Sequence, residues 1–364
     1  MNRLFLFNPE NDIALGSGLA RITPPKMARL LHLGGEALPV WLAQKGDYIL
    51  APDIIDKEFE TAEQLGVTLV RSAKGLDISE LCPWGWSLDA CNQFEKAGVD
   101  EKLVDLHRNR MDAHRELSHR RSSLILKKIL HLDAYELHDT EAVEAKNIDD
   151  AKTFISSVGA AFVKAPWSCS GRGVFRVDIN TFPENSARIL GCIKQQGSVI
   201  IEKALDKVIE FAMLFNYNPA LAASKVCFVG YSMTKTAENG RYLGNVVAPQ
   251  NEIKDTLVSF VSRESLIAIR RAVCSALPLL LGDTYSGPLG IDMMIYRDSA
   301  GAIKVNPCIE INLRYTMGFV ARNLWERRGI KGTLAFVPTN TGLSHEGYDI
   351  VPENDYFRIV LLKA

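Results

Sequence analysis

Short apolar runs and longer segments of helical periodicity alternate in the first third of the chain. Residues 4–7, 48–51 and 67–70 are apolar runs that predict strands. Residues 25–41, interrupted at Gly34-Gly35, and residues 59–65 have the apolar spacing of helices. Strands that alternate with helices predict a small parallel α/β unit. We therefore assign an N-terminal domain to residues 1–105.

Two segments in this domain do not fit the periodic pattern. The sequence NPENDIALGSG follows the first predicted strand at residues 8–18 and starts with turn-forming residues. It leaves the carboxyl end of a strand, where open α/β sheets place ligands. A ligand-binding loop and a plain polar connection fit equally well. The second segment, PWGW at residues 83–86, marks a break before the next elements.

Residues 104–130 are charged and helix-like, and they carry a basic cluster. Its members are His114, Arg115, His119, Arg120, Arg121, Lys127 and Lys128. A charge run is usually a solvated helix face, which is our default interpretation here.

The segment AFVKAPWSCSGRGVFRV, residues 161–177, predicts a strand that ends on Lys164, a loop of small residues, and a second strand. Glycines let a backbone approach closely, backbone N–H groups and hydroxyls can donate to phosphate, and lysine adds a point charge. A hairpin that folds over a polyphosphate fits this pattern, although no P-loop motif is present. Taken alone, an ordinary glycine hairpin with a surface lysine explains it better.

Further strands are predicted at 198–201, 209–215, 226–233, 290–296 and 303–311, and helices at 149–156, 183–195 and 262–281. Asp292 lies within an apolar strand, and Glu310 and Asn312 are two apart in the next strand, so they point to one face. Carboxylates in apolar strands are costly unless they are paired or bind metal. Two carboxylates and an amide oxygen suit Mg²⁺. A solvated edge hairpin is an equally good alternative.

Composition narrows the function classes. The chain has 364 residues, of which 47% are hydrophobic and 23% charged, as in soluble globular proteins of two or three domains. The net charge of −1 argues against a nucleic-acid or membrane-surface partner. Seven scattered cysteines without a CxxC pair indicate a reducing compartment and argue against a disulfide framework or a zinc site. With no signal-peptide pattern and no membrane-length apolar run, we expect a cytoplasmic protein.

Four segments, in one order, resemble the ATP-grasp superfamily over about residues 110–330. FVKAPWSCSGRGV is similar to its phosphate-lysine strand and lid loop, and VIIEKAL with IEFAML to its adenine hinge and ribose-binding strand. LGIDMMIY and IEINLRYTMG resemble its metal-binding strands. The resemblance implies an α/β protein with α+β lobes: a Rossmann-like pre-ATP-grasp domain, then a two-lobed ATP-grasp domain at 106–335. The implied lid lobe spans about 150–215, the metal-binding lobe about 216–335, and a C-terminal segment, 336–364, packs on the core.

The resemblance also implies roles for individual residues. Lys164 would bind the α- and β-phosphates, Glu202 the adenine amino group and Glu210 the ribose. The closing loop would contain Ser168, Ser170, Gly171 and Gly173, and the backbone of Lys203 and Leu205 would contact the adenine edge. Arg120 or Arg121 would add a basic group. Asp292, Glu310 and Asn312 would hold one or two Mg²⁺ ions, for which Mn²⁺ would substitute. Arg314 and Lys235 would face the γ-phosphate.

The implied activity is an ATP- and Mg²⁺-dependent ligation of a small-molecule carboxylate to an amine, or to a thiol, through an acyl phosphate. An ATP-grasp phosphotransferase and a non-catalytic nucleotide-binding protein are the alternatives. We expect ATP rather than NAD, because no Rossmann glycine fingerprint is present. The substrate pocket is expected from the NPENDIALGSG segment, the YTMG segment after Arg314, and the tail at residues 345–348. A homodimer is left open.

Overall fold

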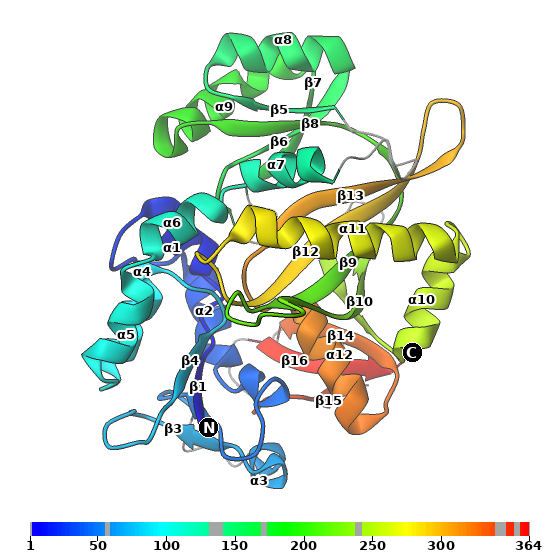
Figure 1. The fold of residues 1–364 in the computed structure, drawn as a ribbon. Coiled ribbons are helices and arrows are strands. Elements are labelled where there is room, and N and C mark those ends of the chain that lie inside the picture. The colour runs from blue at the N-terminus through cyan, green and yellow to red at the C-terminus, as the bar shows by residue number, and fades with distance from the viewer. Residues whose placement is uncertain are drawn as a thin grey trace.

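The computed structural model describes residues 2–54, 59–130, 141–168, 173–236, 242–338, 347–352 and 357–363. Ser170, Gly171 and residues 345–346 of the predicted tail contribution lie outside this part of the chain. The described residues form three sheets with helices between and around them (Figure 1). No helix among them is both long and apolar enough to cross a membrane.

The N-terminal domain contains the predicted parallel sheet. Its strands have the order β3-β2-β1-β4, and all neighbours are parallel. They are β1 (Arg3–Leu6), β2 (Tyr48–Leu50), β3 (Thr68–Val70) and β4 (Glu80–Pro83), and β4 was not predicted. The helices are α1 (Asn11–Ser17), α2 (Lys26–Gly35), α3 (Glu60–Leu65), α4 (Leu88–Lys96) and α5 (Glu101–Arg108), with a 3₁₀ turn η1 (Leu38–Trp41).

One prediction in this domain needs correction, since residues 11–17 of the polar segment form helix α1 rather than a continuous loop. The interruption predicted at Gly34-Gly35 is confirmed, because α2 ends at Gly35 and the 3₁₀ turn η1 follows it. A Cβ at Gly35 would lie 2.3 Å from the ring of Phe7, so a glycine is required for this close approach.

The charged segment at 104–130 is not one solvated helix. It forms α5, α6 (Met111–Leu117) and α7 (Arg121–Ile129). His114, His119, Arg120 and Lys127 are buried. Lys127 lies on α7, which packs against β13 of the central sheet and β5 of the lid sheet. The default interpretation of a solvent-facing charge run is therefore wrong for these four residues.

The lid lobe is a four-stranded antiparallel sheet of order β5-β8-β6-β7. Its strands are β5 (Ala142–Ala145), β6 (Ala160–Lys164), β7 (Val174–Asp178) and β8 (Val199–Lys203). Helices α8 (Ile148–Val158) and α9 (Phe182–Gln196) cover its outer face (Figure 1). The lobe has a hydrophobic core of its own, with Ile155, Val163 and Ile189 at its centre. The predicted hairpin around Lys164 is confirmed, since Lys164 pairs with Val174.

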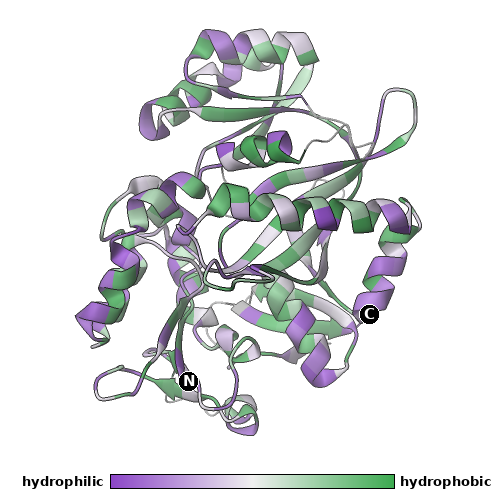
Figure 2. Ribbon diagram, viewed as in Figure 1, coloured by the Kyte–Doolittle hydropathy of each residue, from purple (hydrophilic) through white to green (hydrophobic). Residues whose placement is uncertain are grey.

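The central sheet has eight strands in the order β13-β12-β9-β10-β11-β14-β16-β15. They are β9 (Asp206–Tyr217), β10 (Val226–Thr236), β11 (Tyr242–Val247), β12 (Gly287–Arg297), β13 (Ile303–Asn312), β14 (Gly332–Pro338), β15 (Gly347–Asp349) and β16 (Phe357–Lys363). The helices here are α10 (Gln250–Val258), α11 (Arg263–Leu281) and α12 (Met317–Arg328). Apolar residues flank Asp292 in the middle of β12, whereas α10 at the edge is mostly hydrophilic (Figure 2). The two sheets divide the chain between residues 203 and 206, earlier than the predicted lobe division at 215.

One hydrophobic core joins the N-terminal domain to the far end of the central sheet. Phe7 and Trp41 belong to the same buried cluster as Val320 of α12, Leu334 of β14 and Leu361 of β16. The indole N–H of Trp41 donates to the carbonyl oxygen of Ile350 at 2.7 Å. The N-terminal domain is thus fixed on the central sheet through a continuous apolar interior.

Candidate active site

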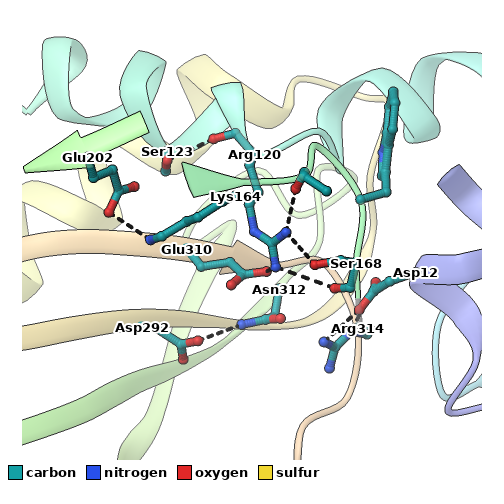
Figure 3. A network of polar contacts seen from close by, with 12 residues as sticks. Asp12, Arg120, Ser123, Lys164, Ser168, Glu202, Asp292, Glu310, Asn312 and Arg314 are labelled. Atoms are coloured by element: carbon teal, nitrogen blue, oxygen red, sulfur yellow. Dashed lines mark hydrogen bonds and ion pairs between the residues drawn. The ribbon is translucent and has the colours of Figure 1, made fainter. Parts of the chain in front are cut away.

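The β12–β13 hairpin brings the predicted metal ligands together. Asp292 is directly opposite Glu310, and Asn312 is opposite Gly290, so the three polar side chains share one face of the sheet. The Asn312 amide Nδ2 donates to Asp292 Oδ2 at 3.0 Å (Figure 3). The predicted face-sharing of Asp292 with Glu310 and Asn312 is therefore confirmed.

The two opposed carboxylates have different protonation behaviour. Burial, followed by the charge of Glu310, raises the pKa of Asp292 to about 7. Burial also acts to raise the pKa of Glu310, but the positive charges of Arg120, Lys164 and Arg314 outweigh it and hold that pKa below its ordinary value. At neutral pH Glu310 is therefore an ionised carboxylate with cationic neighbours, whereas Asp292 keeps its proton to a higher pH than an ordinary aspartate.

Arg120 connects the hairpin to the loop that follows β6. Its Nη2 donates to Glu310 Oε1 at 2.9 Å, and its Nη1 donates to Ser168 Oγ at 2.7 Å and to the carbonyl oxygen of Ala165 (Figure 3). Arg121 points elsewhere, with its Nη2 3.5 Å from Glu144 Oε1. Of the two arginines considered from the sequence, Arg120 is the one at this site.

Lys164 and Glu202 form a buried ion pair on neighbouring strands of the lid sheet, with 2.7 Å between Nζ and Oε2. Glu202 Oε1 is buried and has no hydrogen-bond partner among the described residues. A buried oxygen of this kind is suited to a donor from a bound ligand. The contact predicted between Glu202 and an adenine amino group stays a prediction.

The remaining predicted nucleotide contacts differ in how well they are placed. The backbone N–H of Lys203 donates to the Glu141 carbonyl at 2.9 Å, so that donor is already used, and Leu205 lies in the link between β8 and β9. Glu210 on β9 lies near enough to Asp292 to raise its pKa, and it pairs with Lys207 at 3.2 Å. Lys235 is an exposed residue of β10 rather than of the predicted loop.

Gly173 and Ser168 mark the two ends of the lid loop. A Cβ at Gly173 would lie 2.6 Å from Ser168 Cβ and 2.9 Å from Ala165 Cβ. The Ala165 N–H donates to the Gly173 carbonyl at 2.8 Å. The glycine is therefore required for the loop to close on itself at its base.

A cleft opens beside these groups, between the hairpin, the lid loop and the N-terminal domain. Its lining comprises Asn11, Asp12, Leu15, Ser118, Pro166, Trp167, Ser168, Glu310, Ile311, Asn312, Leu313 and Arg314. Lys235 is not part of this lining, and neither is Tyr348, which belongs to the predicted tail contribution. Arg314 Nη2 donates to Asp12 Oδ2 at 2.9 Å (Figure 3).

The sequence pointed to the NPENDIALGSG segment but not to Asp12, and it gave no role to Ser118 or Trp167. The signal for Asp12 was its place just beyond the carboxyl end of β1, at the ligand-binding edge of a parallel sheet. Ser118 and Trp167 had no comparable signal, because both lie between elements whose packing is set by distant residues.

The donor set on the hairpin fits a hard divalent cation. It offers two carboxylates and an amide oxygen, and Asp292 and Glu310 face one another at a cost that a cation between them would remove. No cluster of three or more His, Cys, Asp or Glu side chains suited to a metal occurs in the described ranges. Mg²⁺ does not need one, since it commonly takes one or two carboxylates and completes its shell with phosphate and water.

Comparison with known proteins gives a result at the level of fold. No protein-family model matches the sequence, and no curated relative matches it. A solved biotin carboxylase–β,γ-ATP complex from Campylobacter jejuni superposes with a TM-score of 0.50 at 12% identity, over 86% of this chain and 65% of that chain. This chain has the ATP-grasp fold. The chain spans slightly less than two thirds of the length of that carboxylase.

The ATP-grasp fold expected from the four sequence segments is therefore confirmed. An N5-carboxyaminoimidazole ribonucleotide synthetase from Thermus thermophilus is a second similar structure, with a TM-score of 0.47 and 14% identity over 100% of this chain and 94% of that chain. At these identities the likeness concerns architecture, and the chemistry of this chain is argued from its own residues.

Proposed function

We propose that this protein is an ATP- and Mg²⁺-dependent ligase that joins a small-molecule carboxylate to an amine and releases ADP and phosphate. The observation that supports this most directly is the convergence of charges on one cleft. Glu310, Asn312 and Arg314 line it, and Arg120 donates to Glu310. Asp292 is opposite Glu310, and Lys164 is close enough to lower the pKa of Glu310. Phosphoryl transfer requires this combination of cations and hard oxygen ligands.

In the proposed reaction an oxygen of the acid substrate attacks the γ-phosphorus of ATP, and the bond from that phosphorus to the ADP oxygen breaks. The acyl phosphate then reacts with the amine, which forms the new C–N bond and expels inorganic phosphate. When bound to Asp292, Glu310 and Asn312, Mg²⁺ would neutralise charge on the β- and γ-phosphates. Lys164 would hold the α- and β-phosphates, and Arg314 would stabilise charge that develops on the transferred group.

The lid loop has a defined task in this proposal. An acyl phosphate is destroyed by water, so the site must be covered during the reaction. The loop after β6 is anchored at its base by Gly173 and Ser168, and Arg120 ties Ser168 to the metal-binding hairpin. During closure over ATP, Arg120 would keep the base of the loop connected to the hairpin.

The cleft favours small substrates that carry polar groups, because the charged side chains of Asp12, Glu310 and Arg314 line it beside apolar ones such as Leu15 and Trp167. The Campylobacter jejuni carboxylase is a complex with β,γ-ATP, which supports ATP as the nucleotide of this protein. Cytoplasmic location, support by Mn²⁺ and a homodimer belong to the same proposal. The six cysteines in the described ranges are free thiols, as a reducing compartment requires.

The test is a screen for Mg²⁺-dependent ADP release with hydroxylamine as a general amine acceptor, so that the acid can be found before the natural amine is known. Acids are supplied singly, and hydroxamate is measured with ADP. ADP and hydroxamate should appear in equal amounts with the correct acid. A phosphorylated small molecule that accumulates with ADP regardless of hydroxylamine would identify a kinase and overturn the ligase proposal.

Asp292→Asn, Glu310→Gln and Asn312→Ala should each lower turnover by about 100-fold or more, because each removes a group that serves charge neutralisation in the transition state. Asp255→Asn removes an exposed carboxylate on α10 and serves as the matched control. Full turnover in all three variants at limiting Mg²⁺ would exclude the hairpin as the metal site.

A further inference from the structure

The N-terminal domain holds Arg314 from two sides. On the backbone side, the Tyr315 N–H donates to the Trp84 carbonyl at 2.8 Å, and Gly85 and Arg314 form an antiparallel β-bridge. On the side-chain side, the carboxylate of Asp12 receives two bonds from the guanidinium, from Nη2 at 2.9 Å and from Nε at 3.3 Å. Both contacts come from residues that are more than 200 positions away along the chain.

The backbone that holds Arg314 is itself held by two asparagines. Asn8 Nδ2 donates to the Gly85 carbonyl at 2.8 Å, and the Gly85 N–H donates to Asn8 Oδ1 at 3.3 Å. The Asn11 amide, in its satisfied orientation, donates to the carbonyls of Gly85 and Trp86, both at 2.9 Å. A Cβ at Gly85 would lie 2.4 Å from the Asn11 amide, so only glycine fits here. The segments NPENDIALGSG and PWGW are therefore two parts of one clamp.

Bidentate pairing has a specific effect on an arginine. A guanidinium on its flexible side chain can adopt many orientations, and a carboxylate that accepts two parallel N–H bonds fixes its plane. The entropy of ordering is then lost during folding rather than at the moment of catalysis. Asp12 and Arg314 are mostly buried, with side-chain exposures of 17% and 19%, so solvent screens the pair only partly.

We propose that Asp12 is a positioning residue that orients Arg314 toward the phosphoryl group. The N-terminal domain then contributes to catalysis through Asp12. The inference rests on the proposed function, since it assigns Arg314 a partner for that reaction. A purely structural pair predicts a different result, because breaking it would lower stability and leave phosphoryl recognition as it was.

The test compares the affinities of Asp12→Asn and wild type for two probes, Mg·ADP and Mg·ADP with aluminium fluoride as a mimic of the transferred phosphoryl group. Mg·ADP should bind both proteins alike. Affinity for the aluminium fluoride complex should fall by about 10- to 100-fold in Asp12→Asn, as expected for a misplaced catalytic group. With the acid found by the hydroxylamine screen, kcat should fall while KM for ATP stays unchanged. Asp12→Glu, which keeps the carboxylate, should restore part of the loss and serves if Asp12→Asn does not fold.

Two controls separate positioning from stability. Asp349→Asn breaks the Arg358–Asp349 pair on β16 and β15, which has the same bidentate geometry, and should change neither affinity. The charge swap Asp12→Arg with Arg314→Asp should recover melting temperature relative to Asp12→Asn but not aluminium fluoride affinity. Wild-type affinity in Asp12→Asn, or its recovery in the swap, would overturn the positioning role alone. A wild-type protein that binds no Mg·ADP would overturn the proposed function together with this role.

Discussion

The lid lobe and the N-terminal domain both border the cleft, but they are attached to the central sheet by different interactions. The lid lobe encloses its own apolar core, centred on Ile155 and Ile189. The N-terminal domain has no such separation on its inner face, where Phe7 and Trp41 share one core with Leu334 and residues of α12 and β16.

The two kinds of attachment predict which of the two regions moves more readily relative to the central sheet. Separating the N-terminal domain from the central sheet would expose buried apolar surface, which costs about 25 cal/mol per Å². The contacts of the lid loop are instead polar or aromatic: Arg120 with Ser168, and the Arg115 guanidinium 4.0 Å from the centre of the Trp167 ring. Such contacts can be exchanged for water or ligand, so we expect the lid to move more readily than the N-terminal domain.

Leu334→Ala and Ile189→Ala provide the strongest test of this contrast, because both residues are fully buried and the two substitutions remove similar volumes. Each should cost about 2–5 kcal/mol. Leu334→Ala should lower hydrogen-exchange protection in β1, β2, β14 and β16 together, whereas Ile189→Ala should lower it in the lid lobe alone. Loss of protection in β1 caused by Ile189→Ala would show that the two cores are not independent.

Lys164→Ala tests whether the lid contributes a phosphate-binding charge. ATP affinity measured by calorimetry should fall by about 1.5–3 kcal/mol, the range for a hydrogen bond to a charged group. Glu141→Gln is the control in the same lobe, since it breaks the exposed Lys203–Glu141 pair. It should change the free energy of ATP binding by less than about 1 kcal/mol. A folded Lys164→Ala protein with wild-type ATP affinity would limit Lys164 to its structural pairing with Glu202.

Two glycines of the lid lobe should respond in opposite directions. Gly173→Ala places a methyl group against Ser168 and Ala165 and should destabilise the lid by about 1–3 kcal/mol, with weaker ATP binding. Gly191→Ala in α9 meets no atom within 4 Å and should stabilise by about 0.5–1 kcal/mol. Thermal melts and ATP titrations of both proteins check this, and equal melting temperatures would argue against a tight turn at Gly173.

The smallest effect concerns the hairpin between the two regions. Because the pKa of Asp292 is raised to about 7 in the folded protein, its contribution to stability is present at low pH and lost as pH rises toward 7. Without metal, the melting temperature of Asp292→Asn should therefore exceed that of wild type by about 2–4 °C at pH 8, and the difference should be smaller at pH 5. Glu310, with its lowered pKa, titrates below this range. A difference that grows toward acid pH would contradict the assignment.

Local pattern was enough to predict the parts of the site that are built from neighbouring residues. The hairpin of β6 and β7 follows from an apolar run, a small-residue loop and a second run, and the facing of Asp292 and Glu310 follows from strand period and a turn. Helix α11 follows from amphipathic spacing. These features depend on chain segments of about 20 residues, over which periodicity is informative.

Long-range pairing accounts for what the sequence did not reveal. The charge pattern alone predicted a solvated position for Arg120, because its partner Glu310 is 190 positions away, and only the family resemblance gave Arg120 or Arg121 a role at the site. The Asp12–Arg314 pair spans 302 positions. Helix α1 was missed because its sequence NDIALGS is polar and glycine-containing, and it is stabilised by packing rather than by intrinsic propensity. Lys235 was expected in a loop because the apolar pattern of the strand ends before it. In the structure β10 continues through Lys235, which pairs with Gly244 of β11.

The bond between Trp41 and Ile350 has a consequence for synthesis on the ribosome. The apolar side of the N-terminal domain is completed by residues 320–361, so Phe7 and Trp41 cannot be fully covered until that part of the chain has emerged. At roughly 5–20 residues per second, the domain stays exposed for on the order of tens of seconds. The nascent chain is therefore expected to need chaperone protection over this interval, and slow translation of the α12–β16 region should increase its aggregation.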